Sequence, residues 1–386
     1  MNTGAAGTTR GNEARPWSSS CTTGEDCTFQ QLAPYIGRMK TSIARSLIGR
    51  FTRPGQIVFD PFAGSGVIPF EAAMLGRSVV ACDTNPYGVL LMRAKFSAPA
   101  SCNGALEQFG ERWAGAQRRL GRQDLRSVPA WVRAFFHPKT LRAVLALRDE
   151  LVDADDPFLM ACLLGILHHQ RPGFLSYPSS HLVPYLRDKL FPRRHFKSLY
   201  EQRDVRSRME AKIRRTFRRP PPVLSSSRIL LADARRLHVF ESIDAIITSP
   251  PYMNELDYVR DNRLRLWFIE RELPTVKDIP RGKREEMFHS LLRRTFTRLL
   301  PVVAPHAAIV IVVGDTRRGG RRTDAAKVVK DVFAAEAFER LWLETEFRDR
   351  IPDIRRSRRD LVGTKRETVL VFRSHAQVDR NAKAAS

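Results

Sequence analysis

The sequence predicts an α/β fold, in which a parallel sheet carries helices on both faces and is interrupted by a large helical insertion. Two observations support this prediction. Short apolar runs alternate with helical patterns over residues 56–83 and again from residue 228 onward, as in βαβ units. Between these two blocks, residues 100–227 repeat their apolar positions mostly at helical spacing.

The first part of the predicted sheet is a βαβ unit. A helical pattern over residues 32–51 ends at Pro54-Gly55, and residues 56–59 then form a short buried strand. A loop at residues 60–66 leads into a helix over residues 67–75, which Gly76 ends. The second strand covers residues 78–82 and stops at Asp83. Strand, glycine loop, helix, strand and acid in this order are typical of nucleotide-binding units.

The remaining elements divide the chain into five parts. Further strands are expected at 228–232, 243–247 and 307–313, helices at 256–269, 285–300 and 327–336, and a closing antiparallel pair at 340–348 and 367–372. We expect a disordered tail over 1–27, the first part of the core over 28–99, a basic helical insertion over 100–227, the second part of the core over 228–374 and a tail over 375–386.

The charge of the chain indicates a polyanionic partner. Its formal net charge is +24 and its pI is about 10.7. Such an excess repels itself in a compact state and favours binding to nucleic acid. The five cysteines have no metal-ligand spacing, and scattered thiols are typical of a reduced, cytoplasmic protein. The longest apolar runs, 159–167 and 307–313, are too short to span a bilayer, so no membrane partner is expected.

The first motif, Phe59-Asp60-Pro61-Phe62-Ala63-Gly64-Ser65-Gly66, is a glycine loop suited to a nucleoside-type cofactor. Gly64 and Gly66 lack a Cβ, so the backbone can approach a ligand and the next helix can present its N-terminus. Asp83 follows about twenty residues later, where an acid binds ribose hydroxyls in such units. The third glycine of an NAD fingerprint is replaced by Pro69, and no Walker A motif for ATP occurs.

The second motif, Thr248-Ser249-Pro250-Pro251-Tyr252, follows a predicted strand. An exocyclic amino group of cytosine or adenine is a poor nucleophile because its lone pair is delocalised into the ring. Acceptors aimed at its two N–H groups favour the nucleophilic geometry, and the Ser249 hydroxyl and the Pro250 carbonyl can supply them. The prolines fix the direction of that carbonyl, and Tyr252 can stack on an extruded base.

Together these motifs resemble motifs I and IV of the S-adenosylmethionine-dependent amino-methyltransferases of DNA, which methylate cytosine at N4 or adenine at N6. The resemblance covers residues 33–96 and 228–373, and the insertion matches no motif of the family. It implies a Rossmann-like methyltransferase sheet and S-adenosylmethionine as the cofactor. The implied catalytic residues are Ser249, Pro250, Pro251 and Tyr252, and the implied cofactor-binding residues are Tyr35, Gly37, Asp60, Pro61, Phe62, Gly64, Gly66, Asp83 and Asp233.

The family pattern also implies individual roles. Asp60 would face the methionine amino group and Phe62 would pack on the cofactor. Tyr35-Ile36-Gly37-Arg38 looks like the segment over the methionine end, and Asp233 stands where the family contacts adenine. The family commonly has Asp or Asn at the position of Ser249. Because Ser is most frequent there in the cytosine-N4 enzymes, we expect cytosine N4 rather than adenine N6 as the target.

The resemblance therefore predicts a site-specific methyltransferase of double-stranded DNA, with a restriction enzyme as a further partner. The arginines between residues 187 and 219, and those between 348 and 366, are expected to contact DNA. One alternative is an RNA methyltransferase acting on guanine N2 or adenine N6, because similar loops serve there. Another is a nucleic-acid-binding protein with a decayed core, which the intact motifs argue against. Cytosine-C5 methylation is disfavoured because the Pro-Cys pair of its nucleophile is missing.

Overall fold

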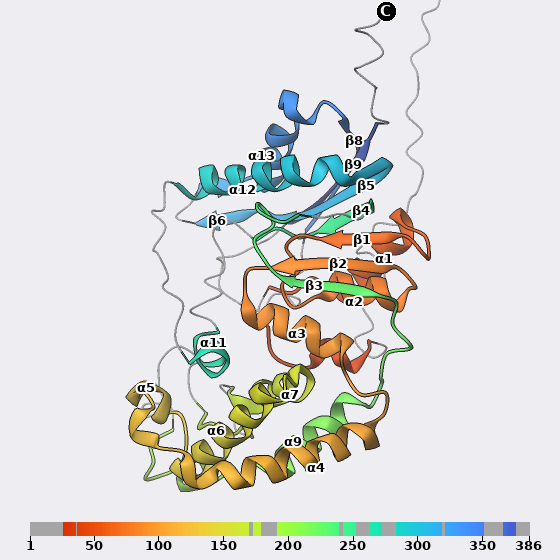
Figure 1. Ribbon diagram of the computed structural model, residues 1–386. Coiled ribbons are helices and arrows are strands. Elements are labelled where there is room, and N and C mark those ends of the chain that lie inside the picture. The colour runs from red at the N-terminus through yellow and green to blue at the C-terminus, as the bar shows by residue number, and fades with distance from the viewer. Residues whose placement is uncertain are drawn as a thin grey trace, which may run out of the picture.

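The computed structural model describes residues 26–35, 37–169, 173–178, 191–238, 242–251, 262–271, 283–318, 321–350 and 366–375. Its sheet strands are β1 (Ile57–Asp60), β2 (Ser78–Asp83), β3 (Ser227–Leu231), β4 (Ile243–Thr248), β5 (Val303–Gly314), β8 (Leu341–Arg350) and β9 (Arg366–Ser374). They form one seven-stranded sheet in the order β3-β2-β1-β4-β5-β9-β8, which Figure 1 shows from its β8 end at the top to β3 below. Strands β1 to β5 are parallel, and β9 runs antiparallel to both β5 and β8.

Helices cover both faces of the sheet, as predicted for a Rossmann-like α/β fold. The first face carries α1 (Thr41–Phe51), α2 (Val67–Met74) and α3 (Pro86–Phe96), and the second carries α12 (Arg284–Leu299) and α13 (Ala325–Phe333). Strand β4 shows why both faces are apolar: Ala245 and Ile247 pack on the first side, while Ile243 and Ile246 pack on the second. Short 3₁₀ turns η6 (Leu300–Val302) and η7 (Glu336–Phe338) and the hairpin β6 (Thr316–Arg318) and β7 (Arg321–Thr323) complete this half. The sequence did not predict the hairpin.

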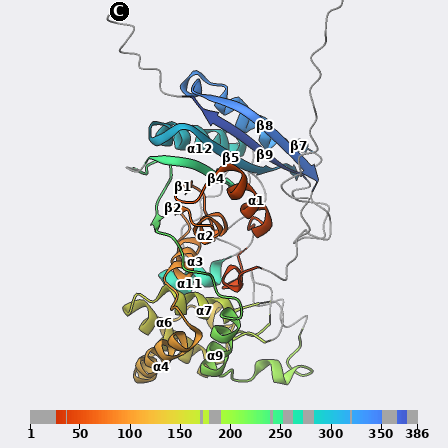
Figure 2. The same cartoon turned by 90° about the vertical axis from the view of Figure 1, so that its right-hand side faces the viewer.

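The described part of the insertion contains helices and no strand. These are α4 (Cys102–Arg119), η2 (Leu120–Arg122), η3 (Leu125–Ser127), α5 (Ala130–Arg133), α6 (Pro138–Asp153), α7 (Pro157–Leu167), η4 (Lys197–Tyr200) and α9 (Val205–Thr216). They lie beyond α3, at the β3 edge of the sheet (Figures 1 and 2). Every residue of α7 is buried, and one apolar cluster joins α7 to Phe70 of α2 and Tyr87 of α3. The insertion therefore shares a core with the sheet helices. Among the described residues, no helix has the length and apolar character required to cross a bilayer.

Two predictions about the N-terminal part were wrong in their bounds. The helix expected from residue 32 begins only at Thr41, because Gly37 has a φ of +78° and breaks the helical backbone. Of the tail expected over residues 1–27, residues 1–25 lie outside the described residues, whereas Cys27 is buried and the turn η1 (Thr28–Gln31) follows it. Phe29 anchors this turn against the rings of Phe158 and Phe217. The sequence pattern did not reveal the anchor at Phe29, because the residues before it are mostly small and polar.

Candidate active site at the carboxyl ends of β1 and β4

The two sequence motifs meet where the strand order reverses. Strand β1 pairs with β2 on one side and with β4 on the other, and open α/β sheets bind ligands outside the carboxyl ends of the strands at such a point. The first motif leaves the sheet at Asp60 and the second at Thr248. The Thr248 Oγ1 donates a hydrogen bond of 2.6 Å to Asp60 Oδ1, across 188 positions of sequence. Thr248 is fully buried, so this link lies inside the floor of the site.

Asp60 is a buried carboxyl group held between the two motifs. Only 2% of its surface is exposed, and its Oδ1 also accepts a hydrogen bond from the Phe62 backbone amide at 3.1 Å. Burial raises the pKa of Asp60 to about 7, although the hydrogen bonds from Thr248 and Phe62 act in the opposite direction. A group that titrates near neutrality can be stabilised as a carboxylate by a cation bound beside it.

Asp83 shapes the glycine loop from the end of β2. Its Oδ2 accepts a 2.7 Å hydrogen bond from the Gly64 amide, and its Oδ1 accepts one of 2.8 Å from Asn85. Burial raises the pKa of Asp83, and these backbone amides oppose that rise. Gly64 and Gly66 both adopt positive φ values, +53° and +75°, as the tight loop requires. A carboxylate has about four acceptor positions, so Asp83 can hold the loop and still accept ribose hydroxyls.

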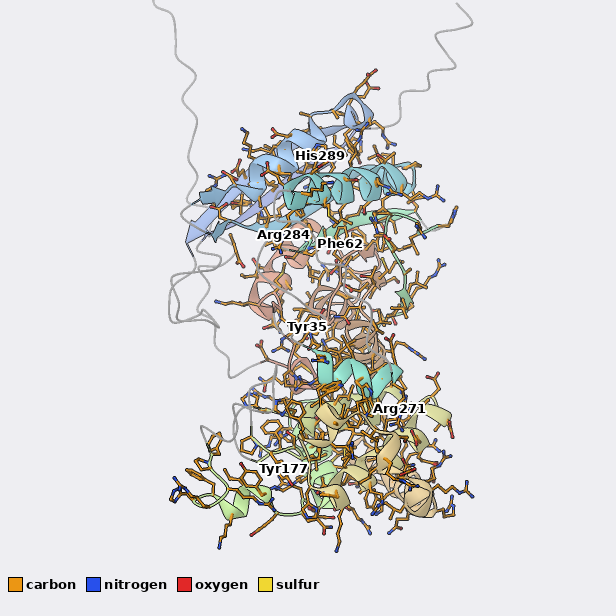
Figure 3. All side chains as sticks on the ribbon, turned by 90° about the vertical axis from the view of Figure 1, so that its left-hand side faces the viewer. Tyr35, Phe62, Tyr177, Arg271, Arg284 and His289 are labelled. Carbon is orange, nitrogen blue, oxygen red and sulfur yellow. The ribbon has the colours of Figure 1, made fainter. Side chains whose placement is uncertain are left out.

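Tyr35 borders the same loop. Its ring lies 3.4 Å from the position that a Cβ on Gly64 would take, and the Asn85 side-chain amide lies 3.4 Å from its hydroxyl. Figure 3 looks onto the carboxyl ends of the strands and shows Phe62 and Tyr35 on this face. Gly37 is exposed and turns the chain two residues later. The structure thus brings Tyr35 to the first motif.

The groups around the loop fit the amino-acid end of S-adenosylmethionine. Helix α2 starts at Gly66 without a side-chain cap, so its first amides can donate to a carboxylate. Asp60, at the start of the same loop, has a carboxylate that can accept from an ammonium group, and Asp83 has acceptor positions that ribose hydroxyls could use. The chemistry of this donor and acceptor set matches a zwitterionic ligand with an attached nucleoside.

The second motif enters the site directly after Thr248. Ser249 and Pro251 are half-buried and Pro250 is buried. Because Thr248 forms a hydrogen bond with Asp60, Ser249 is one residue away from this contact between the two motifs. Tyr252 lies outside the described residues.

Asp233 lies just beyond β3, at the next strand end along the sheet. Its carboxylate accepts hydrogen bonds from the side chain and backbone of Arg235, with Nη2 at 2.6 Å and the amide at 2.9 Å. The hydrogen bond from Arg235 holds the pKa of Asp233 below its usual range. The neighbouring Ala232 amide donates to the Asp83 carbonyl at 3.1 Å, which ties this turn to the end of β2. Asp233 is thus an ionised acceptor at the rim of the site.

The insertion anchors the helix that follows the second motif, α11 (Arg263–Glu270). Arg148 of α6 donates to the carbonyls of Phe268 and Ile269, both at 2.8 Å, and so caps the end of this helix. Arg265 is buried and donates to the carbonyls of Leu164 at 3.2 Å and His168 at 2.8 Å, at the end of α7. The insertion therefore holds α11 in place as well as sharing the core.

Several residues that support the site were not found from the sequence. They are Gln30, Glu71, Gly88 and Lys95. Glu71 and Lys95 carried a usable signal, because each is a charged residue that helical spacing places among apolar ones. Gly88 carried none, since its importance depends on which element packs against it.

Replacing Gly88 with alanine is expected to weaken binding of S-adenosylmethionine by about tenfold, because the new Cβ must displace the loop. That Cβ would stand 2.5 Å from the backbone carbonyl oxygen of Gly64. Calorimetry with S-adenosylmethionine measures the change. Gly110→Ala on α4, where nothing lies within 4 Å of the new Cβ, is the matched control. Wild-type affinity in the Gly88 variant would show that the loop tolerates displacement.

The chain is similar to one family model and to several solved structures. Residues 17–92 match a family model described as DNA methylase, of the N6 and N4 type. No curated protein matches the chain. Similar solved structures include TrmN from Thermus thermophilus (14% identity, 90% of this chain and 52% of that one, TM-score 0.35). Another is the rRNA methyltransferase aviRa from Streptomyces viridochromogenes (12% identity, 92% of this chain and 95% of that one, TM-score 0.33). A third is a SAM-dependent methyltransferase from Methanosarcina mazei (9% identity, 86% of this chain and 98% of that one, TM-score 0.36). Our chain thus spans about half the length of TrmN, and TM-scores this low do not bear on substrate.

The family match lies over the glycine loop, the segment that carries Tyr35 and the end of β2. It thus covers most of the groups that fit S-adenosylmethionine in the structure. The sheet order, the loop geometry and this match together support a methyltransferase enzyme with S-adenosylmethionine as its cofactor.

Proposed function

We propose that the protein transfers a methyl group from S-adenosylmethionine to the exocyclic amino group of a base flipped out of DNA. The observation that carries this proposal is the hydrogen bond between Thr248 and Asp60. It places the residue that would accept from the amino group, Ser249, next to the loop that would hold the methyl donor. The family match over residues 17–92 gives independent support.

The chain contributes positioning and hydrogen bonds to this reaction. S-adenosylmethionine supplies an electrophilic methyl group on a sulfonium. The Ser249 hydroxyl and the Pro250 carbonyl accept the two N–H groups of the base and so favour a nucleophilic nitrogen. Asp60 and the first amides of α2 would hold the amino-acid end of the donor. Such orientation contributes about 7–11 kcal/mol in well-aligned systems, and no covalent link to the enzyme is needed.

Cytosine N4 is the favoured target within this proposal, and adenine N6 is the second. The preference rests on the serine at position 249, which the resemblance associates with the cytosine-N4 enzymes. An RNA base remains the alternative substrate, because an amino group on an unpaired base meets the same acceptors. Net charge does not separate the two, since both are polyanions.

The nucleic acid is proposed to approach along α5 and α11. Both helices lie on the side of the molecule that carries the carboxyl ends of the strands, whereas α9 leads toward the amino end of β3 (Figure 1). The Arg263 guanidinium stacks 4.3 Å from the centroid of the Trp131 ring and forms no ion pair with any described residue, while the neighbouring Arg133 is exposed. The exposed arginines of α9, which the sequence pattern favoured, lie away from this approach.

Replacing Arg263 with alanine is expected to weaken DNA binding several-fold, and to lower the slope of log affinity against log salt concentration by about 1. Arg214→Ala on α9 removes an equally basic, exposed residue and is the matched control, with affinity expected to stay near that of wild type. Fluorescence anisotropy with a labelled duplex at several salt concentrations measures both. If Arg214→Ala weakened DNA binding more than Arg263→Ala, the DNA-binding surface would instead include α9.

The function itself is tested with labelled methyl. Protein and methyl-labelled S-adenosylmethionine are incubated with duplex DNA or with RNA, and the products are digested to nucleosides and identified by mass spectrometry. We expect N4-methylcytosine from DNA. Methyl found only in RNA would overturn the DNA assignment, and N6-methyladenine from DNA would change the base. A protein that gives no heat with S-adenosylmethionine would instead be a decayed scaffold.

A further inference from the structure

One face of α3 supports the glycine loop from below. The three residues that contact the loop recur at helical spacing: Gly88, Met92 and Lys95. The first two act by close packing. A Cβ on Gly88 would stand 2.5 Å from the Gly64 carbonyl oxygen, and one on Gly66 would stand 2.3 Å from Met92 Cγ. Lys95 contacts the loop through hydrogen bonds instead.

Lys95 is a lysine buried beneath the candidate cofactor loop. Only 3% of its surface is exposed. Its Nζ donates to the carbonyl of Ser65 at 2.8 Å and to Gln30 Oε1 at 2.8 Å, and the Gly66 carbonyl lies 3.5 Å away. Burying an ammonium group is unfavourable unless its hydrogen bonds are satisfied, and here the backbone of the loop satisfies them.

A polar network holds Lys95 in this place. Gln30 donates from its Nε2 to Glu71 Oε1 at 2.9 Å, and Arg45 donates from Nε and Nη2 to the other oxygen of Glu71, both at 3.0 Å. The network therefore joins η1, α1, α2 and α3. Burial, and secondarily the charge of Arg38, lower the pKa of Lys95 to about 7, which the charge of Glu71 opposes.

Lys95 contacts the carbonyls of the peptides that precede and open α2. The peptide between Ser65 and Gly66 is held at both ends, by Lys95 at its carbonyl and by the Ala63 carbonyl, 2.7 Å from its amide. In the next peptide the Gly66 carbonyl faces Lys95. Because a trans peptide places its N–H opposite its C=O, the Val67 amide points away from Lys95. That amide is the first of α2, which has no side-chain cap.

We propose that Lys95 is a positioning residue for S-adenosylmethionine, which aims the first amides of α2 at the carboxylate of the cofactor by holding the carbonyls of Ser65 and Gly66. The role depends on the proposed function only for the identity of the ligand. A lysine that merely filled the core would not need to meet two consecutive carbonyls of the loop.

The test is calorimetry of S-adenosylmethionine and S-adenosylhomocysteine binding to Lys95→Met, which keeps the side-chain length and removes the donors. We expect both dissociation constants to rise by about tenfold, the order expected for the loss of one well-formed hydrogen bond. In methylation assays the KM for S-adenosylmethionine should rise similarly, while kcat at saturating cofactor and the affinity for DNA stay at wild-type values. A change confined to thermal stability would overturn the role.

Lys212→Met on α9 is the matched control. Lys212 is also buried and donates to a backbone carbonyl, that of Gln31 at 3.2 Å in η1, rather than to a carbonyl of the glycine loop. It should lose stability without losing cofactor affinity. If Lys95→Met fails to fold, Lys95→Gln keeps one donor group and should weaken binding by about threefold; wild-type affinity there would equally overturn the proposal. Wild-type protein that binds no S-adenosylmethionine would contradict the proposed cofactor rather than the role of Lys95.

Discussion

Ser249→Ala is expected to lower kcat for methyl transfer by about a hundredfold or more, the loss seen when a positioned hydrogen-bonding group is removed from a reaction centre. The affinity for S-adenosylmethionine should stay near wild type. The reason is that different residues would contact the base and the cofactor. Ser249 would meet the amino group of the base, whereas Asp60, Asp83 and the glycine loop would hold the cofactor. Single-turnover methylation of a DNA duplex and calorimetry with the cofactor measure the two quantities separately.

Two further variants sharpen that test. Ser249→Asn restores an acceptor of the kind that the related enzymes carry, so it should recover part of the activity that alanine loses. Thr248→Val removes the neighbouring hydroxyl that donates to Asp60, and it should weaken cofactor binding while leaving kcat at saturating cofactor nearly unchanged. If Ser249→Ala protein methylated DNA at the wild-type rate, the second motif would not be the catalytic loop.

Asp60→Asn is expected to weaken binding of S-adenosylmethionine in a pH-dependent manner. Because the pKa of Asp60 lies at about 7, the wild-type group is largely neutral at pH 6 and resembles asparagine there. At pH 8 it is ionised and can pair with the ammonium group of the cofactor, so the wild type should then bind about tenfold or more tightly than the variant. Calorimetry of both proteins at pH 6, 7 and 8 gives the ratio, which should rise through pH 7.

The same group has an opposite effect on stability. Its pKa in the folded protein is raised above the ordinary value of 3.8, so the folded state binds more protons than the unfolded state between pH 4 and 7. Stability therefore falls as pH rises through this window. Asp60→Asn should remove that fall and make the protein without cofactor more stable than wild type above pH 7, by roughly 2–4 kcal/mol. An affinity ratio independent of pH would show that Asp60 does not face the charge of the cofactor.

Local patterns predicted most of the sheet. The parallel strands β1, β2, β3 and β4 lie close to the expected ranges because each is a short apolar run that ends at an acid or a motif. The start of α1 was misplaced because apolar spacing continues through residues 32–40, although the left-handed backbone at Gly37 forbids a helix. Charge counting also favoured the arginines of α9, since composition carries no information on which side of the sheet a helix lies.

The sequence by itself determined the two chemical motifs and the α/β class, because both depend on residues that are neighbours along the chain. Only the tertiary structure decided that Asp60 and Thr248 form a hydrogen bond with one another, that α3 supports the glycine loop through Gly88, Met92 and Lys95, and that α11 rather than α9 lies on the side of the carboxyl ends of the strands. These relations join elements far apart in sequence. They are set by strand order and helix packing, which bury the loop supports where no local pattern can reveal them.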